Sequence, residues 1–278
     1  MSAIHLDNRL VHYEVFGRGQ PIIFLHSWLG SWRYWVSTMD LASERYRAYA
    51  LDFWGYGESD RRGSSFNISS YVDMLCRFMD QMGMTAANLV GHGMGGVVAI
   101  RAARERPERF LRVMTVATPL HGGVLAGHVK PGAFSKLLGR GLSPNVWSRL
   151  IRSIPIADAE VQQELVEDTE GLSDEVLGHV QQSLLDTDLR PAVGALAVPL
   201  LAVYGGQDRI VAAEHATFLN ELGDRPVQLL VLPKANHFPF LEQSNIFSRL
   251  LIDFLTSSGT PVEIKEEWRR RVSQIDYL

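Results

Sequence analysis

The sequence has a single cysteine, no long apolar run and no excess of either charge. Cys76 has no second cysteine to pair with and lies among apolar residues at helical spacing, so we expect a buried, unreactive thiol rather than a disulfide. The net charge is -4 and the pI is near 6.1. Because Lys and Arg form no cluster, we expect neither nucleic acid nor a membrane surface as a partner.

Segments that would direct the chain to a membrane or a secretory route are also missing. Residues 1–7 lack the basic and apolar pattern of a targeting segment, and the longest apolar run, 193–204, is too short for a bilayer and contains Pro199. We therefore expect a cytoplasmic protein, a monomer or homodimer, that binds a small, largely apolar molecule. Its 278 residues, 46% of them hydrophobic, suffice for one large α/β domain with an insertion or for two small domains.

What the sequence does have is a regular alternation of apolar strands and amphipathic helices. This alternation predicts an α/β fold with a mostly parallel sheet flanked by helices. Strands are expected at 9–16, 22–25, 46–51, 88–90, 110–117, 199–204 and 227–232, the first of them as an edge strand. Helices are expected at 34–41, 69–82, 95–106, 212–222 and 242–255.

The alternation is interrupted once, by a glycine-rich stretch followed by helical patterns alone. This change predicts a helical lid, 120–194, inserted into a core formed by 1–119 and 195–258. The lid helices are expected at 144–152, 158–167 and 174–185.

Residues 259–278 form a tail after a linker-like stretch. Ile264, Trp268, Val272 and Ile275 share one face of a helix in this tail. We expect the tail to be a helix that packs on the protein's own flank, with a partner or second subunit as the alternative.

The most informative stretch is the turn between the strand at 88–90 and the helix at 95–106. Gly91 to Gly95 has the outline of G-x-S-x-G, the sharp turn that presents a nucleophilic serine above a sheet, but glycine stands at position 93. The same stretch also spells G-x-G-x-x-G through Gly96. A dinucleotide site needs an acidic residue after the next strand, and that strand ends at Thr118-Pro119, so we reject this alternative.

Two further residues follow strands in the order that a hydrolase requires. Asp208 comes after the strand at 199–204 and His237 after the strand at 227–232, and the carboxyl ends of parallel strands border one crevice. A histidine can move a proton, and a carboxylate can hold its tautomer. With position 93 they complete the order of nucleophile, acid and histidine. Gly93, Asp208 and His237 are therefore the candidate catalytic set, with Gly93 marking the place of the missing nucleophile.

Several motifs together resemble the α/β-hydrolases of the lidded esterase, lactonase and C-C hydrolase type, over residues 8–255. The matching runs are His26-Ser27-Trp28-Leu29-Gly30 for H-G-x-x-G, Asp52-Phe53-Trp54-Gly55-Tyr56-Gly57-Glu58-Ser59 for D-x-R-G-x-G-x-S, and Asn236-His237-Phe238-Pro239 for G-H-x-P. The resemblance implies the α/β-hydrolase fold and ester-type hydrolysis without a cofactor. It also implies an oxyanion hole from the backbone N–H groups of Trp28 and Met94. The substrate pocket is expected to include His26, Ser27, Trp54 and Phe238.

The departures from these motifs concern the chemistry directly. Gly93 removes the hydroxyl that would form an acyl-enzyme, Ser27 replaces the glycine after His26, and Trp54 replaces an arginine. The absence of aspartate at position 93 argues against haloalkane dehalogenase and epoxide hydrolase chemistry. A purely conformational explanation also exists, because the elbow residue often has a positive φ that glycine tolerates freely.

Three explanations of Gly93 are open from the sequence. The chain is a serine hydrolase that has lost its nucleophile, a non-hydrolytic or water-using enzyme that relies on His237 and the oxyanion hole, or a binding protein that has kept only the pocket. Under the first, Gly93→Ser is expected to restore esterase activity. Ser27 is either a relocated nucleophile or a loop serine bonded to backbone, and the sequence favours the second. The histidines after Pro119 have no third ligand at metal spacing, so no metal is expected.

Overall fold

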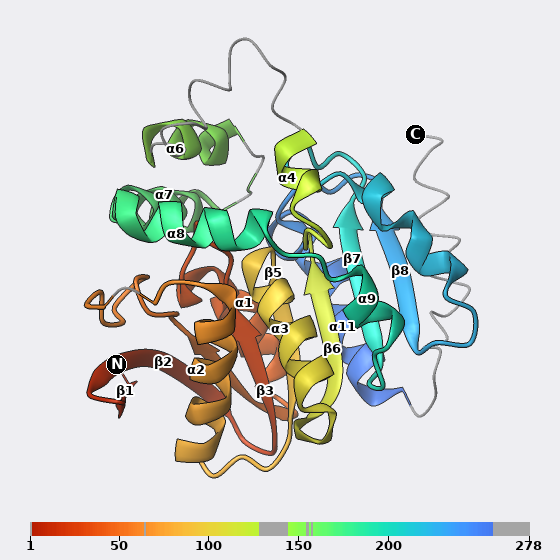
Figure 1. The fold of residues 1–278 in the computed structure, drawn as a ribbon, viewed down its shortest axis with the longest axis horizontal. Coiled ribbons are helices and arrows are strands. Elements are labelled where there is room, and N and C mark those ends of the chain that lie inside the picture. The colour runs from red at the N-terminus through yellow and green to blue at the C-terminus, as the bar shows by residue number, and fades with distance from the viewer. Residues whose placement is uncertain (1, 64, 128–143, 154–155, 157, 258–278) are drawn as a thin grey trace.

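The computed structural model describes residues 2–63, 65–127, 144–153, 156 and 158–257. Its centre is an eight-stranded sheet with the strand order β1-β2-β4-β3-β5-β6-β7-β8 (Figure 1). Only the β1–β2 and β2–β4 pairings are antiparallel, and all the others are parallel. The strands are β1 Ser2–Leu6, β2 Arg9–Gly17, β3 Gln20–Leu25, β4 Tyr46–Leu51, β5 Ala87–His92, β6 Phe110–Val116, β7 Leu200–Gly205 and β8 Val227–Leu232.

Helices cover both faces of the sheet because successive strand side chains point to opposite faces. Ile23 and Leu25 of β3 belong to the apolar cluster beneath α2 and α3, whereas Ile22 and Phe24 belong to the cluster beneath α1 and α11. The flanking helices are η1 Trp32–Trp35, α1 Val36–Ala42, α2 Ile68–Gln81, α3 Met94–Glu105, η2 Pro107–Arg109, η3 Ala213–Glu221, α10 Pro239–Glu242 and α11 Ser244–Thr256.

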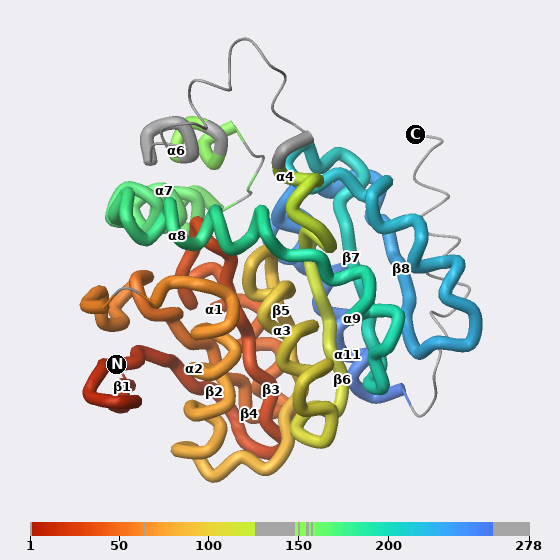
Figure 2. Tube along the Cα trace, in the orientation of Figure 1, coloured from red at the N-terminus to blue at the C-terminus, as the bar shows by residue number. Residues whose placement is uncertain are grey.

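The described part of the segment between β6 and β7 contains helices and one isolated β-bridge, between His121 and Asp188. The helices are α4 Gly123–Gly127, α6 Pro144–Ser153, α7 Ala159–Glu170, α8 Asp174–Leu185 and α9 Arg190–Gly194. Side-chain caps start two of them, since Asp158 accepts the N–H of Glu160 and Ser173 accepts the N–H of Val176. Figures 1 and 2 show α6, α7 and α8 grouped at one end of the sheet, and α7 packs against η1.

One expectation about secondary structure is wrong. The strand at 9–16 is not an edge strand, because β1 pairs with it on its outer side through a tight turn at Asp7 and Asn8. Both turn residues have positive φ, which Asp and Asn tolerate, but β1 itself is too short and too polar to stand out in the sequence. The helix expected at 212–222 is confirmed as η3, which is of the 3-10 type, with buried Ala216 and Leu219 three residues apart. The tail at 259–278 lies outside the described residues.

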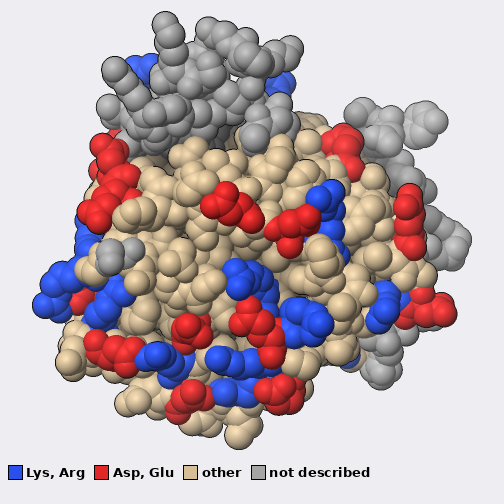
Figure 3. All heavy atoms as spheres, viewed as in Figure 1, with Lys and Arg blue, Asp and Glu red and all other residues tan. Residues whose placement is uncertain are grey.

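The surface agrees with the charge pattern of the sequence on the side that Figure 3 shows. Acidic and basic side chains are interspersed there and form no large patch of one sign. None of the described helices is long and apolar enough to cross a membrane.

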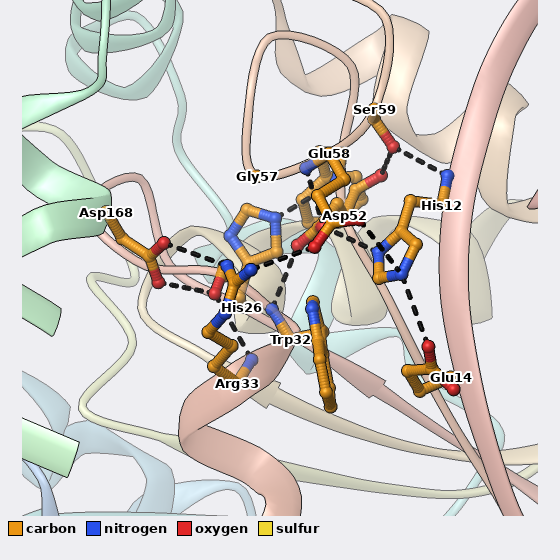
Figure 4. A network of polar contacts seen from close by, with 12 residues as sticks. His12, Glu14, His26, Trp32, Arg33, Asp52, Gly57, Glu58, Ser59 and Asp168 are labelled. Carbon is orange, nitrogen blue, oxygen red and sulfur yellow. Dashed lines mark hydrogen bonds and ion pairs between the residues drawn. The ribbon is translucent and has the colours of Figure 1, made fainter. Parts of the chain in front are cut away.

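A buried carboxylate organises the loop after β4. Asp52 has no exposed surface and accepts hydrogen bonds from His12 Nδ1 at 2.9 Å, from the Trp32 N–H at 2.9 Å and from the Glu58 N–H at 3.1 Å (Figure 4). Burial alone would raise its pKa, but His12 and the other partners outweigh burial and hold the pKa of Asp52 below its usual value. The motif that begins at Asp52 therefore has a structural role in this chain.

The same network ties the insertion to the core. Asp168 of α7 accepts a hydrogen bond from Ser31 Oγ at 2.5 Å and pairs with Arg33 at 3.1 Å. Arg33 also pairs with Glu58 at 2.8 Å, and Figure 4 shows its guanidinium between the two carboxylates. One residue further on, Thr169 Oγ1 donates to the Leu29 carbonyl at 3.3 Å. These contacts hold α7 against the loop that follows β3.

The Asp168 contact should make stability depend on pH. Burial raises the pKa of Asp168 to about 6, with Asp52 and Glu164 adding to the rise and Ser31 and Arg33 opposing it. A pKa above the unfolded value means that the stabilisation is complete below pH 3.8 and is lost as the pH rises towards 6. We expect the free energy of unfolding of the unmodified chain to fall by about 1–3 kcal/mol relative to Asp168→Asn between about pH 4 and pH 7. Urea unfolding of both proteins checks this, and a difference that is constant or grows with pH contradicts it.

Candidate active site

The elbow between β5 and α3 has the backbone of a nucleophile turn. Gly93 lies between the two elements with φ +49 and ψ -112, a conformation that L side chains rarely adopt. Gly91 and Gly95, two residues before and after Gly93, are required by close packing. A Cβ on Gly91 would lie 2.4 Å from the Gly95 carbonyl carbon, and a Cβ on Gly95 would lie 2.2 Å from the Leu25 carbonyl oxygen. The glycines are thus explained by the turn itself, as in G-x-S-x-G.

Asp208 and His237 meet as the sequence predicts. They follow β7 and β8, and His237 Nδ1 lies 2.8 Å from Asp208 Oδ2. The other oxygen of Asp208 accepts the N–H groups of Ile210 at 2.7 Å and Val211 at 3.1 Å. Burial would raise the pKa of Asp208, but His237 and these two N–H groups outweigh burial and lower it. An ionised Asp208 accepts a hydrogen bond from His237 Nδ1–H, and this tautomer leaves Nε2 unprotonated and able to act as a base.

A chain of hydrogen bonds that the sequence analysis missed links the loops after β3 and β8. His92 Nε2 lies 3.1 Å from the His237 carbonyl oxygen, which can only accept, so Nε2 carries the proton. His92 Nδ1 then accepts from Tyr34 O–H at 3.2 Å, and the Tyr34 oxygen accepts the Ser27 N–H at 2.5 Å. Burial and the nearby His237 lower the pKa of His92 well below its usual value, so the ring is neutral.

Two residues fix the loop that carries His237. Glu242 accepts the N–H groups of Asn236 and Phe238, the latter at 3.0 Å. The Phe238 ring stands nearly perpendicular to the His237 ring, with centroids 5.1 Å apart, and 4.9 Å from His92. Phe238 therefore lies beside His237, and its place in a substrate pocket stays a prediction. Glu242 was not predicted, since its only signal is an acidic residue in the short helix that follows Pro239.

Ser27 lies at the elbow itself. The residue is 4% exposed, and the Met94 N–H donates to its Oγ at 3.4 Å. A Cβ built on Gly93 would lie 2.2 Å from Ser27 Oγ and 3.0 Å from Ser27 Cβ. The Ser27 side chain thus takes the space of a side chain at position 93, so one of the two side chains must shift in Gly93→Ser. The Ser27 hydroxyl is thus bonded to a backbone group, as the sequence favours. That group is the N–H of Met94, which the resemblance assigns to the oxyanion hole.

Two other predicted pocket residues have contacts of a different kind. His26 has no exposed surface: its Nε2 accepts the Phe53 N–H at 3.0 Å, and its Nδ1–H donates to the Ser27 carbonyl at 2.6 Å. Burial lowers the pKa of His26, so this neutral ring joins two loops and does not face a ligand. Trp54 is covered by the guanidinium of Arg9, 4.1 Å from its ring centroid. None of the contacts described for Trp54 joins it to His237.

The remaining predicted residues, Trp28 and Met94, are both buried beside the elbow, at 7% and 1% exposure. Met94 is the first residue of α3, where N–H groups have no partner within the helix. In the part of the chain that the structure describes, no three His, Cys, Asp or Glu side chains converge in a way that could hold a metal ion.

Comparison with known proteins identifies this architecture. Residues 20–133 match the family described as alpha/beta hydrolase fold. Among solved structures, the chain is similar to the enol-lactonase from Burkholderia xenovorans LB400, with a TM-score of 0.77 and 18% identity over 92% of this chain and 100% of that one. The chain has the α/β-hydrolase fold.

Sequence relatives of this α/β-hydrolase-fold chain include hydrolases. It is 26% identical to the pimeloyl-[acyl-carrier protein] methyl ester esterase of Aliivibrio fischeri, over 88% of this chain and 97% of that protein. It is 29% identical to the dihydrolipoyllysine-residue acetyltransferase component of the acetoin cleaving system of Cupriavidus necator, over 88% of this chain. The match spans 66% of that longer protein. The similarity to the esterase over nearly its whole length supports hydrolysis as the class of reaction.

Proposed function

We propose that the protein hydrolyses an ester-type bond, in an ester or a lactone, of a small and largely apolar compound. In this proposal His237 is the general base and Asp208 holds its tautomer, while the N–H groups of Met94 and Trp28 stabilise the oxyanion. Residues 120–194 act as a lid over the site. The similarity to an esterase and a lactonase supports the substrate class.

The observation that carries this proposal is the intact pair of Asp208 and His237. A protein that only binds a ligand has no need of a carboxylate that is buried, bonded to two N–H groups and placed 2.8 Å from an imidazole nitrogen. Such a pair sets the tautomer of the imidazole, which matters for proton transfer. We therefore favour an enzyme over a binding protein.

Position 93 limits the mechanism. Gly93 offers no oxygen, so no acyl-enzyme forms there, and the attacking oxygen comes from water or from another hydroxyl. His237 Nε2 accepts the proton of that oxygen as it adds to the carbonyl carbon, and then returns the proton to the departing alcohol. The negative charge on the carbonyl oxygen is stabilised by donors of the backbone, which do not depend on the residue at position 93.

A panel of p-nitrophenyl esters with acetyl, butyryl and octanoyl groups, together with γ- and δ-lactones, tests the proposal. We expect at least one of them to be turned over more than roughly 10⁴-fold faster than in buffer, since about 10³- to 10⁴-fold is what an oxyanion hole and binding alone supply. Initial rates over a range of substrate concentrations give kcat and KM. If compounds of the panel shift the melting temperature, and so bind, but none is turned over, the chain is a binding protein and the proposal fails.

A further inference from the structure

The hydroxyl absent from position 93 has a counterpart in the loop that follows the neighbouring strand, β3. β3 and β5 pair in parallel with Leu25 opposite Gly91. Two residues further along each chain come Ser27 and Gly93, and Ser27 Oγ lies 2.2 Å from where a Cβ of residue 93 would be. Two departures from the hydrolase motifs, a serine after His26 and a glycine at the elbow, thus meet at one point in space.

The backbone of Ser27 is held so firmly that only its side chain can turn. Its N–H donates to the Tyr34 oxygen at 2.5 Å. Its carbonyl accepts from His26 Nδ1 at 2.6 Å and from the Gly30 N–H at 3.2 Å. Tyr34 continues through His92 to the carbonyl of His237. This chain of hydrogen bonds therefore sets the position of Ser27 relative to the loop that carries His237. A nucleophile needs such a fixed position relative to its base.

The hydroxyl of Ser27 also has its own proton to give. Its oxygen accepts the Met94 N–H at 3.4 Å, and among the described residues no hydrogen bond from this hydroxyl to a protein acceptor is found. A catalytic serine needs such a proton, because the base removes it as the oxygen attacks. No hydrogen bond between Ser27 and His237 is found among the described residues, and bonds between nucleophile and base are often long without substrate and shorten when it binds.

We propose that Ser27 is the nucleophile, moved from the elbow to the loop after β3. This inference rests on the ester hydrolysis proposed above. The Oγ of Ser27 forms a bond to the substrate carbonyl carbon while its proton passes to His237 Nε2. The bond from that carbon to the alcohol oxygen then breaks, and the alcohol leaves with the proton from His237. Water attacks the acyl ester on Ser27 with His237 again as base, which releases the acid and restores the hydroxyl.

Replacing the hydroxyl by a thiol tests the geometry without any substrate. The native Cys76 is buried, and burial raises the pKa of its thiol, so Cys76 should react little with the reagent. The thiol introduced by Ser27→Cys can therefore be measured separately. Rates of iodoacetamide alkylation across pH give the pKa of the introduced thiol. We expect it at least about one unit below the usual value near 8.5, because His237 stabilises the thiolate, and back near 8.5 in Ser27→Cys/His237→Gln. A pKa at or above 8.5 that His237→Gln leaves unchanged overturns the proposal.

Covalent labelling separates this inference from the proposed function. A fluorophosphonate probe should modify the unmodified chain on Ser27, located by mass spectrometry of its peptides, and should not modify Ser27→Ala. If esters are turned over but Ser27→Ala keeps the full rate and the probe leaves Ser27 untouched, the ester hydrolase stands and Ser27 is not its nucleophile. If no ester is turned over and yet the thiol of Ser27→Cys has the low pKa that depends on His237, the placement of Ser27 stands and the ester substrate is wrong.

Discussion

The double substitution Ser27→Gly, Gly93→Ser is expected to hydrolyse p-nitrophenyl butyrate roughly 10³-fold faster than Ser27→Gly alone, because it returns a nucleophile to the elbow. Asp208 and His237 are already in place to serve a serine there, and the turn already has the φ of +49 that this position requires. Ser27→Gly is the proper reference, since it has a hydroxyl at neither position. Initial rates of the two variants measure the gain.

Gly93→Ser by itself is expected to behave differently. Its Cβ would lie 2.2 Å from Ser27 Oγ and 3.0 Å from Ser27 Cβ, so the two side chains cannot both keep their places. Overpacking of this kind costs about 1–3 kcal/mol of stability, and relief requires the Ser27 side chain to turn away from position 93, because hydrogen bonds hold its backbone. We expect a lower melting temperature than that of the double variant. If Gly93→Ser equals the double variant in both stability and rate, the two positions do not exclude one another.

Most of the fold could be predicted because its signals are local. Apolar strands alternate with amphipathic helices, and the glycines at 91 and 95 reflect the close contact of a strand, a turn and a helix. The pair of Asp208 and His237 could be predicted as well, because both residues end parallel strands and such ends border one crevice. The order of these residues along the chain is thus enough to indicate that the two side chains meet.

The contact between Ser27 and Gly93 could not be predicted in the same way. It depends on β3 lying between β4 and β5 and on the register that pairs Leu25 with Gly91. Neither the strand order nor the register follows from the periodicity of a single segment. The bonds of Tyr34 to Ser27 and to His92 depend on the same arrangement.

His26 shows the opposite difficulty. A histidine in a motif next to the oxyanion loop suggests a role toward the substrate, but both nitrogens of its ring bond to backbone groups inside the protein. Residue type and motif position do not reveal whether a polar side chain bonds to the chain or to a ligand. The hydrogen-bond partners of the side chain in the folded structure decide this. Asp52 is a second example, because its partners are also groups of the protein itself.

His237→Ala is expected to lower kcat for any ester that the chain hydrolyses by roughly 10²- to 10⁴-fold, whichever oxygen attacks, because it removes the general base. Asp208→Asn is the matched variant: it keeps the shape of the acid but no longer favours the tautomer with Nδ1–H, so a loss of up to roughly 10⁴-fold is expected there too. Steady-state rates and melting temperatures of both variants should be measured together. Among the described residues, the only polar contact of the His237 side chain is the bond to Asp208. Its removal should therefore change the affinity for a ligand only modestly.

The two variants also separate catalysis from binding. An enzyme that uses this pair loses turnover in both variants while KM and the thermal shift with substrate stay within a few fold, since neither change removes an oxyanion donor. A receptor would show altered affinity alone, with no rate to lose. If His237→Ala is folded and binds ligand normally but still forms product at the full rate, His237 is not the base. The reaction then does not depend on the pair of Asp208 and His237.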